Sequence, residues 1–263
     1  MAAGIIGSML GLGGGIIIVP VLTLVLHLPL RDAIGASIVS VIATSSGAAV
    51  AYVRDGLSNI RIGMFLEVAT TTGAIMGAYL AGVLSVTLLY VIFGLMLAYS
   101  AIALLQNRHV EIPQVAESHP LAKKLKMSSY YHDQVLNRDI QYQVANPYGG
   151  LGMMWAAGLM SGLLGIGSGL FKVLAMDTFM KLPLKVSTAT SNFMIGVTAA
   201  ASAGVYFARG DIRPTLATPV AIGVLIGALA GTRWMVKFRN KTLRYIFVPV
   251  LLATAAEMIL RGA

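Results

Sequence analysis

The stretch GLGGGIIIVP at residues 11–20, with its near copy GIGSGLFKVL at residues 165–174, places glycines inside two of the most apolar regions of the chain. Glycine costs a helix interior about 1 kcal/mol and adopts backbone angles that other residues avoid. Each cluster therefore predicts a break in a helix. In hydrocarbon such a break survives only where it is buried in protein or faces a polar cavity, because each unsatisfied backbone group costs several kcal/mol.

The sequence around the two clusters has the composition of a membrane protein. Of its 263 residues, 57% are hydrophobic and 11% are charged, and the mean hydropathy is +0.81. A helix needs roughly 20 apolar residues to cross a bilayer core about 30 Å thick. Stretches of sufficient length, of which the second holds two spans, lie at residues 33–53, 62–106, 186–208, 214–232 and 243–260. We therefore expect an all-α polytopic membrane protein.

Charge and residue types exclude several classes of function. The net charge of +9 would suit nucleic acid in a soluble chain, but loop lysines and arginines beside anionic lipid explain it more simply. The predicted spans contain no cysteine, no histidine cluster and no paired carboxylates. The groups of an active site or a metal site are therefore missing from the spans. We expect a protein that is not an enzyme, that needs no cofactor or metal, and that contacts the lipid bilayer and not nucleic acid; its oligomeric state is left open.

The second half of the chain repeats the first at an offset of 154 positions: HLPLRDAIGAS at 27–37 aligns with KLPLKVSTATS at 181–191. The intervening segment is charged and has no apolar run of spanning length, so a solvated connector is favoured over a binding segment. We therefore divide the chain into a first membrane repeat, a linker and a second membrane repeat, at residues 1–105, 106–148 and 149–263.

The distribution of lysine and arginine predicts how the repeats are oriented. If each glycine-rich segment crossed the membrane, ten cations would lie on one face and eight on the other. If each segment instead enters and returns as a re-entrant hairpin, 14 cations share one face against 4 on the other, which the positive-inside rule favours. Each repeat is then a broken, re-entrant helix plus three transmembrane helices, and the two repeats are inverted. The linker is expected in the cytoplasm and both termini outside the plasma membrane.

Two breaks at equivalent places imply one shared cavity. Half-helices that begin after Gly15 and Gly169 would point their N-terminal amides and positive dipole ends into it, which suits an anion. Hydroxyl and amide donors on the following helix of each repeat, where Thr44 corresponds to Thr198, would complete the site, although such residues also join membrane helices to one another. The predicted anion-binding residues are Gly11, Gly13, Gly14, Gly15, Ser37, Thr44, Gly165, Gly167, Ser168, Gly169, Lys172, Ser191 and Asn192.

Other glycines favour a role in helix packing. Gly73 with Gly77, and Gly158 with Gly162, have the small-xxx-small spacing that lets membrane helices approach closely.

Three ionisable residues in apolar stretches are candidates for function. Lys172 is the only cation deep in such a stretch, and Ile18 is its counterpart in the first repeat. Asp177 could contribute to proton coupling, or pair with Lys172 or Lys181. Glu67 lies near the expected cytoplasmic end of its span, where it could carry protons or simply extend its carboxylate to the membrane surface.

The doubled glycine motifs, each followed by LPL and a small polar helix, with ATSNF at residues 189–193, resemble the sulfite exporter TauE/SafE family of membrane permeases. The resemblance covers about residues 2–104 and 149–260. It implies transport of sulfur-containing anions such as sulfite, sulfoacetate or related organosulfonates, often outward. The second copy departs from the motif at Ser168, which replaces a glycine, and at Leu174, which replaces a proline.

From these features we expect a secondary transporter, and specifically an exporter, of a small sulfur-containing anion, working by alternating access with the anion at the broken-helix N-termini. A negative cell interior favours anion exit by roughly 2.3 kcal/mol per charge per 100 mV, so export needs no coupling ion. The alternative is a proton-coupled uptake permease for organic or inorganic anions; an anion channel is a third possibility.

Overall fold

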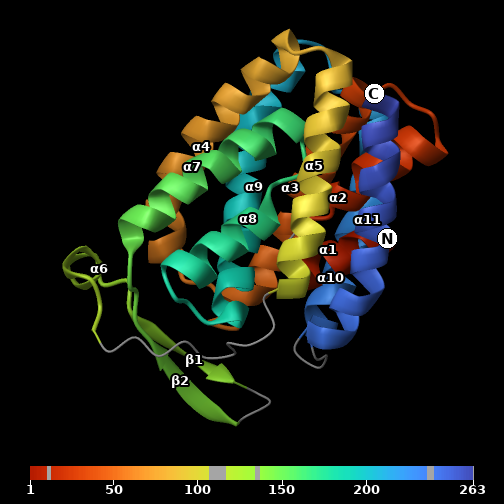
Figure 1. The fold of residues 1–263 in the computed structure, drawn as a ribbon. Coiled ribbons are helices and arrows are strands. Elements are labelled where there is room, and N and C mark those ends of the chain that lie inside the picture. The colour runs from red at the N-terminus through yellow and green to blue at the C-terminus, as the bar shows by residue number, and fades with distance from the viewer. Residues whose placement is uncertain (11–12, 107–116, 134–136, 236–239, 263) are drawn as a thin grey trace.

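The computed structural model describes residues 1–10, 13–106, 117–133, 137–235 and 240–262, which form a bundle of helices with a small β-hairpin beside one end (Figure 1). The first half contains α1 (Ala2–Leu10), α2 (Gly15–Pro20), the π-helical segment η1 (Val21–Val25), α3 (Leu30–Arg54), α4 (Ile60–Val83) and α5 (Val86–Gln106). The second half contains α7 (Pro147–Leu164), α8 (Gly169–Leu174), the π-helical segment η2 (Ala175–Phe179), α9 (Leu184–Ala208), α10 (Pro214–Met235) and α11 (Asn240–Gly262).

The linker between the halves forms helix α6 (Pro120–Lys124) and an antiparallel hairpin of strands β1 (Ser129–Asp133) and β2 (Arg138–Tyr142). The expectation of an all-α protein was therefore wrong at this point, although most of the described chain is helical. Both strands bury their third and fifth residues, as the two-residue period of a strand requires when only one face is covered.

The covered face of the hairpin packs on the membrane repeats, so the interpretation of the linker as a solvated connector is corrected. Its Tyr131 and Ile140 belong to the same buried cluster as Leu66 of α4 and Met154 of α7. Burial of this kind stabilises a folded position for the linker through removal of apolar surface from water.

Polar contacts also hold the linker in place. Asn59, which caps α4, donates from Nδ2 to the Met127 carbonyl at 2.8 Å and to the Tyr142 hydroxyl at 2.8 Å. Burial raises the pKa of Tyr142, which keeps that hydroxyl protonated. At the other end of the two strands, Lys185 of α9 donates to both carboxylate oxygens of Asp133, at 3.0 and 2.9 Å.

Within the described residues, three helical stretches are long and apolar enough to cross a membrane: Leu30–Arg54, Ile60–Val83 and Pro214–Arg233. Shorter apolar helices lie at Gly15–Val25 and Val86–Ile102. The architecture is that of a helical membrane protein with broken helices among its spans.

The backbone carries the sequence repeat, since left-handed residues recur at the offset of 154. Gly13 and Gly167 have φ values of 72° and 73°, and His27 and Lys181 have φ values of 52° and 57°. Equivalent tyrosines also make equivalent hydrogen bonds. Tyr52 donates to the Ser8 carbonyl at 3.0 Å, and Tyr206 donates to the Gly162 carbonyl at 2.7 Å.

The second glycine cluster turns its helix back on itself. The amide of Ala145, just before α7, donates to the carbonyl of Met180, just after η2, at 3.1 Å. The start of α7 and the end of η2 therefore lie together, and α7, α8 and η2 form a hairpin with the glycine cluster at its tip.

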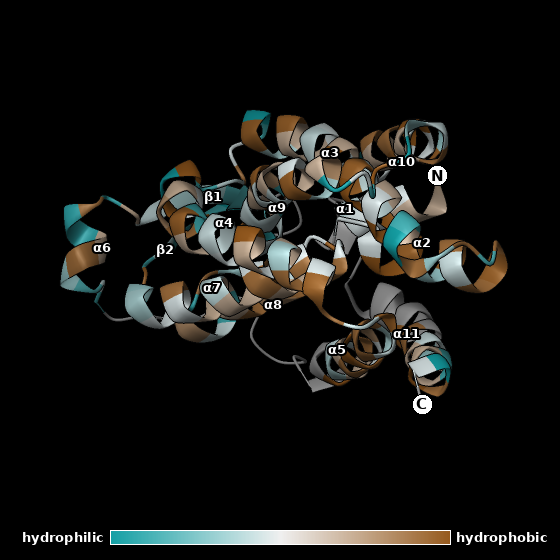
Figure 2. Cartoon of the chain, turned by 90° about the horizontal axis from the view of Figure 1, so that it is seen from above, coloured by the Kyte–Doolittle hydropathy of each residue, from teal (hydrophilic) through white to brown (hydrophobic). Residues whose placement is uncertain are grey.

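The two halves interlock, because the broken helix of each repeat packs on the other repeat. Helix α1 packs on α10 and α7 packs on α4, while α3 packs on its equivalent α9. The remaining equivalents, α5 and α11, lie side by side at the edge of the bundle (Figure 2).

Glycines permit the closest of these contacts, which confirms the predicted packing role. Gly158 and Gly162 of α7 have the carbonyl groups of Thr70 and Ala74 of α4 where a β-carbon would project. On the α4 side, Gly73 and Gly77 lie in the same way against Trp155 and Leu159. Residue numbers rise together along the two helices, so α4 and α7 run in the same direction.

Helices α3 and α10 are related in the same way. Gly35 lies against Asp211 just before α10, and Gly47 lies against Leu225. These two helices therefore also run in the same direction.

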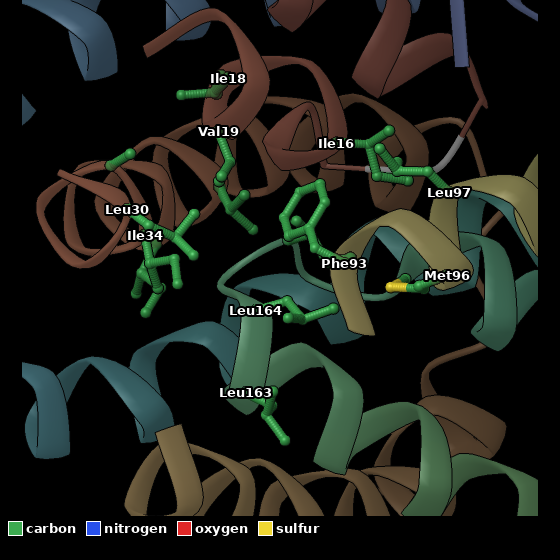
Figure 3. Close-up of a cluster of buried hydrophobic side chains, with 14 of the residues drawn as sticks. Ile16, Ile18, Val19, Leu30, Ile34, Phe93, Met96, Leu97, Leu163 and Leu164 are labelled. Atoms are coloured by element: carbon green, nitrogen blue, oxygen red, sulfur yellow. The ribbon is translucent and has the colours of Figure 1, made fainter. Parts of the chain in front are cut away.

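A continuous apolar core joins the broken helices to their neighbours. Ile16 and Val19 of α2 share one buried cluster with Ile34 of α3, Phe93 of α5 and Leu164 of α7 (Figure 3). This core fixes the two glycine clusters near the centre of the bundle.

Candidate functional site

The two glycine clusters meet at the middle of α3 and α9. A β-carbon added at Gly13 would lie 3.0 Å from Ile195 and 3.2 Å from Val41, and one added at Gly167 would lie 2.8 and 2.9 Å from the same two side chains. Val41 and Ile195 are equivalent residues of the two repeats. The two breaks thus lie against the same pair of side chains and are packed closely on them. The shared cavity stays a prediction.

The half-helices α2 and α8 begin at these breaks. Each is preceded by a left-handed residue, Gly14 with φ 79° and Ser168 with φ 44°. The breaks also touch each other, since a β-carbon on Gly15 would lie 2.7 Å from the Cα atom of Ile166. The N-terminal ends of the two half-helices are therefore neighbours at the centre of the molecule.

Equivalent serines donate to carbonyl groups on either side of the second break. Ser37 of α3 donates to the Gly165 carbonyl at 2.8 Å, and Ser191 of α9 donates to the Gly169 carbonyl at 3.3 Å. Both serines are fully buried. The structure thus places these two predicted residues in contact with the break.

Two further predicted residues have different surroundings. Asn192 donates from Nδ2 to the carbonyls of Ser8 and Thr188, both at 3.1 Å, and its buried Oδ1 has no partner in the described part of the chain. The Thr44 hydroxyl donates at 2.9 Å to the Ser40 carbonyl within its own helix. Asn192 therefore joins α9 to the first broken helix, whereas the Thr44 hydroxyl bonds within its own helix.

Lys172 is completely buried in α8, and its ammonium group donates to the Thr198 hydroxyl at 2.5 Å. The same hydroxyl lies 2.6 Å from Oε1 of Glu67, to which it can donate. The Thr71 hydroxyl donates to that carboxylate oxygen as well, at 3.0 Å. Thr198 therefore bridges the buried ammonium group and a carboxylate from the other repeat.

Glu67 does not reach the membrane surface. It is the eighth residue of α4 and only 6% exposed, so the explanation that its carboxylate extends to the headgroups was wrong. Its second oxygen, Oε2, is buried and has no hydrogen-bond partner among the described residues.

The sequence alone does not predict the contact between Lys172, Thr198 and Glu67. Thr198 was recognised as the equivalent of Thr44, but its neighbours come from segments far apart in the chain, at Glu67 and Lys172. The repeat contains the one available signal: Lys172 stands where the first repeat has Ile18, and a buried ammonium group needs a partner that an isoleucine side chain does not.

Of the remaining predicted residues, Gly11 lies outside the described residues, and Asp177 lies half-buried in η2. The hydroxyl of Ser168 is buried at the start of α8 and has no partner in the described part of the molecule. Among the described residues, buried oxygens without a partner thus include those of Ser168, in the second break, and of Asn192, on α9.

The charges at this centre are balanced. An uncompensated buried charge typically costs about 3–5 kcal/mol, so the ammonium group of Lys172 and the carboxylate of Glu67 stabilise each other through the hydroxyl between them. An additional anion entering this region would find a cation already present, together with backbone amides of the half-helices.

Comparisons with known proteins relate the chain to membrane transporters. The model of the family described as sulfite exporter TauE/SafE matches residues 1–258. A probable membrane transporter protein YunE of Bacillus subtilis is 26% identical over 100% of this chain and 95% of its own length. A second protein of that organism, the probable membrane transporter protein YdhB, is 27% identical over 96% of this chain and 93% of its own length. No solved structure matches the chain significantly.

Proposed function

The chain belongs to the sulfite exporter TauE/SafE family, a family of membrane transporters and not of enzymes, and we propose that it moves a small sulfur-containing anion across the cell membrane. The substrate class is sulfite or an organosulfonate. The observation that carries this proposal is the meeting of the two glycine breaks beside one buried lysine, Lys172.

The anion would bind where α2 and α8 begin. Backbone amides at a helix start are freed from helical hydrogen bonds and carry partial positive charge. Lys172 adds a full positive charge one turn further along α8. The hydroxyl of Ser168 has no partner in the described structure and would donate to an anion oxygen, as would the amide of Asn192 after release from its backbone partners. The glycines of the two breaks would line the same site through their backbone, and Ser37, Thr44 and Ser191 would contribute their hydroxyl groups.

Alternating access requires two units that can move against each other, and we propose that these are inverted repeats. Helix α4 runs in the direction of α9, because Gly63 lies against Thr190 and Glu67 lies against Thr198. Helix α3 runs the opposite way, because Ser45 lies against Gly196 and Ala48 packs in one cluster with Ala189. Helices α3 and α4 are therefore antiparallel. Because α10 runs with α3, and α7 runs with α4, the equivalent helices α4 and α10 run in opposite directions. Together with the positive-inside pattern, this supports a cytoplasmic linker and external termini.

For an anion that moves without a coupling ion, outward movement is the favoured direction. With a negative interior, the membrane potential drives a monovalent anion outward by roughly 2.3 kcal/mol per 100 mV. Proton-coupled uptake is the second candidate, and the burial of Glu67 beside the Lys172–Thr198 contact is the observation that favours it.

The experiment is flux into proteoliposomes, with labelled sulfite, sulfoacetate and methanesulfonate as probes, under imposed voltages and pH gradients. We expect saturable flux of at least one probe. Lys172→Gln should lower it at least tenfold, because a hydrogen bond to a charged group is worth about 1.5–3 kcal/mol. Lys181→Gln is the matched control, because Lys181 is an exposed lysine just after η2. This variant should keep wild-type flux. Failure of all three probes to move through folded wild-type protein would overturn the assignment.

A further inference from the structure

We propose that Glu67 competes with the transported anion for Lys172, and that one proton therefore accompanies each anion. The inference rests on the proposed transport function and specifies how its central charges are regulated. In the structure the carboxylate of Glu67 is the anion that balances Lys172. A substrate anion must replace it.

The hydrogen bonds of Thr198 allow a substrate anion to replace Glu67 beside Lys172. Thr198 receives a hydrogen bond from Lys172 at 2.5 Å and lies 2.6 Å from Oε1 of Glu67. Its hydroxyl can also donate to the Met194 carbonyl of its own helix, at 2.9 Å. Thr198 thus has a second acceptor when Glu67 is released, and the bridge can open without leaving a buried hydroxyl proton unpaired.

Charge balance supplies the proton. Lys172 and Glu67 together are neutral, and both are buried. An anion bound to Lys172 would leave the carboxylate without a compensating charge in a region from which water is excluded. A proton carried by Glu67 as the anion binds removes this uncompensated charge. The loaded site is then neutral again.

The proton has a defined place on the carboxylate. Both hydrogen bonds to this group, from Thr71 and Thr198, end on Oε1. Oε2 is buried without a partner in the described part of the chain, so it can accept the proton while Oε1 keeps the bond from Thr71.

The other charged groups on and around α4 do not take over the roles of Lys172 and Glu67. Helix α7 carries no charged residue, and α9 carries Lys185 alone, which is paired with Asp133 of the linker. On α4 itself, Arg61 donates to the Lys126 carbonyl at 2.9 Å. Asp177 in η2 is half-buried on the hairpin that carries Lys172, and its effect is tested separately below.

The pair occurs once although the fold is duplicated. Ile18 stands in place of Lys172, and α10, the equivalent of α4, has no acidic residue. The pair therefore joins Glu67 of the first repeat to Lys172 of the second, and the equivalent positions carry no such pair.

The test uses methanesulfonate, whose sulfonate stays singly charged across the physiological pH range, so that pH acts on the protein. With the voltage clamped at zero, a pH gradient should drive accumulation in wild-type proteoliposomes up to about tenfold per pH unit. Glu67→Gln should abolish this accumulation, retain exchange of internal for external anion, and make net flux respond to voltage. Asp177→Asn should keep the pH-driven accumulation.

Asp32→Asn is the matched control, because Asp32 is also a buried carboxylate with an unpartnered oxygen in the described structure, and it pairs with Arg213 instead. It should behave like wild type. Accumulation driven by the pH gradient in Glu67→Gln would overturn the inference while leaving transport intact. Absence of flux in the wild type would instead overturn the transport function and the inference with it.

A second pair of variants, Thr198→Val and Thr70→Val, keeps the charges of both Lys172 and Glu67. These variants test the inference even if Glu67→Gln fails to fold. Thr198→Val removes the bridge and should move the pH midpoint of anion exchange by about one unit. Thr70→Val removes an equally buried hydroxyl of α4 that bonds only to carbonyls of its own helix, and should leave the midpoint unchanged. Equal midpoints in both variants would contradict the role of Thr198.

Discussion

Ser168 combines two unfavourable features in one residue. It adopts a left-handed conformation, with φ 44°, where the first repeat has Gly14. Its hydroxyl is also buried without a partner in the described structure. The left-handed conformation costs a residue other than glycine about 1–2 kcal/mol, and such local strain often accompanies function.

Replacing this residue should separate stability from binding. Ser168→Gly should raise the free energy of unfolding by about 1 kcal/mol, because the strain is removed, while lowering the apparent affinity for the anion. Thermal unfolding in detergent and concentration-dependent flux measure the two effects. Lys181→Gly relieves a similar left-handed residue, with φ 57°, and should affect stability alone. An unchanged affinity in Ser168→Gly would show that the hydroxyl does not contact substrate.

At the scale of helices, the contact between α4 and α7 depends on glycines from both sides. Where their β-carbons would project, Gly158 and Gly162 meet carbonyl groups of α4, and Gly73 and Gly77 meet carbonyl groups of α7. Such close approach replaces side-chain packing with backbone packing. Because α4 carries Glu67 and α7 leads into the second break, this contact sets the distance between the carboxylate and Lys172.

One methyl group should be enough to disturb this interface. Gly162→Ala places a β-carbon directly against the Ala74 carbonyl, and we expect a loss of about 1–3 kcal/mol in stability from overpacking, with reduced flux. Gly152→Ala is the control in the same helix, since nothing lies within 4 Å of its added β-carbon. It should be neutral or slightly stabilising. Equal loss of thermal stability in both variants would contradict the role of backbone packing.

The helix breaks could be predicted from sequence because glycine clusters act locally, and their repetition located both of them. The burial of Glu67 could not, because it depends on how α4 is rotated against α9. That rotation is fixed by the distant contacts of Gly63 with Phe193 and Thr190. A carboxylate near the end of an apolar stretch has the same local sequence whether it faces lipid or protein.

The hairpin in the linker is a second feature that could not be predicted from the sequence. Its charge correctly indicated a segment without a membrane span, but the hairpin depends on Tyr131, Ile140 and Tyr142 finding a surface on the repeats. Two five-residue strands form a marginal structure on their own. Their stability comes from tertiary contact, for which the sequence contains no local pattern.

For the molecule as a whole, the linker ties the first repeat to the second at one end of the bundle. Asn59 holds it to the turn before α4, and Lys185 holds it to the start of α9. The linker thus contacts both units that alternating access would move. A change in its docking should alter the balance between their two arrangements.

The ion pair between Lys185 and Asp133 should be the stronger part of this attachment. Asp133→Asn should weaken it by about 2 kcal/mol, as expected for a buried hydrogen bond to a charged group, and amide hydrogen exchange in β1 and β2 should become faster. Asp139→Asn removes an exposed pair with His132 in the same hairpin and should have little effect. Slow exchange in both variants would show that the ion pair is not needed to hold the hairpin.

The interlocked packing of α1 on α10 and of α7 on α4 has an evolutionary consequence. A half-length ancestor would have left most of α1 or α7 uncovered, because the helix that packs most extensively on each belongs to the other copy. We therefore expect that the ancestral polypeptide assembled as a homodimer before gene duplication and fusion. Fusion then freed the two copies to diverge, and only afterwards could a lysine on one side and a glutamate on the other be acquired once each, giving a symmetric scaffold an asymmetric centre.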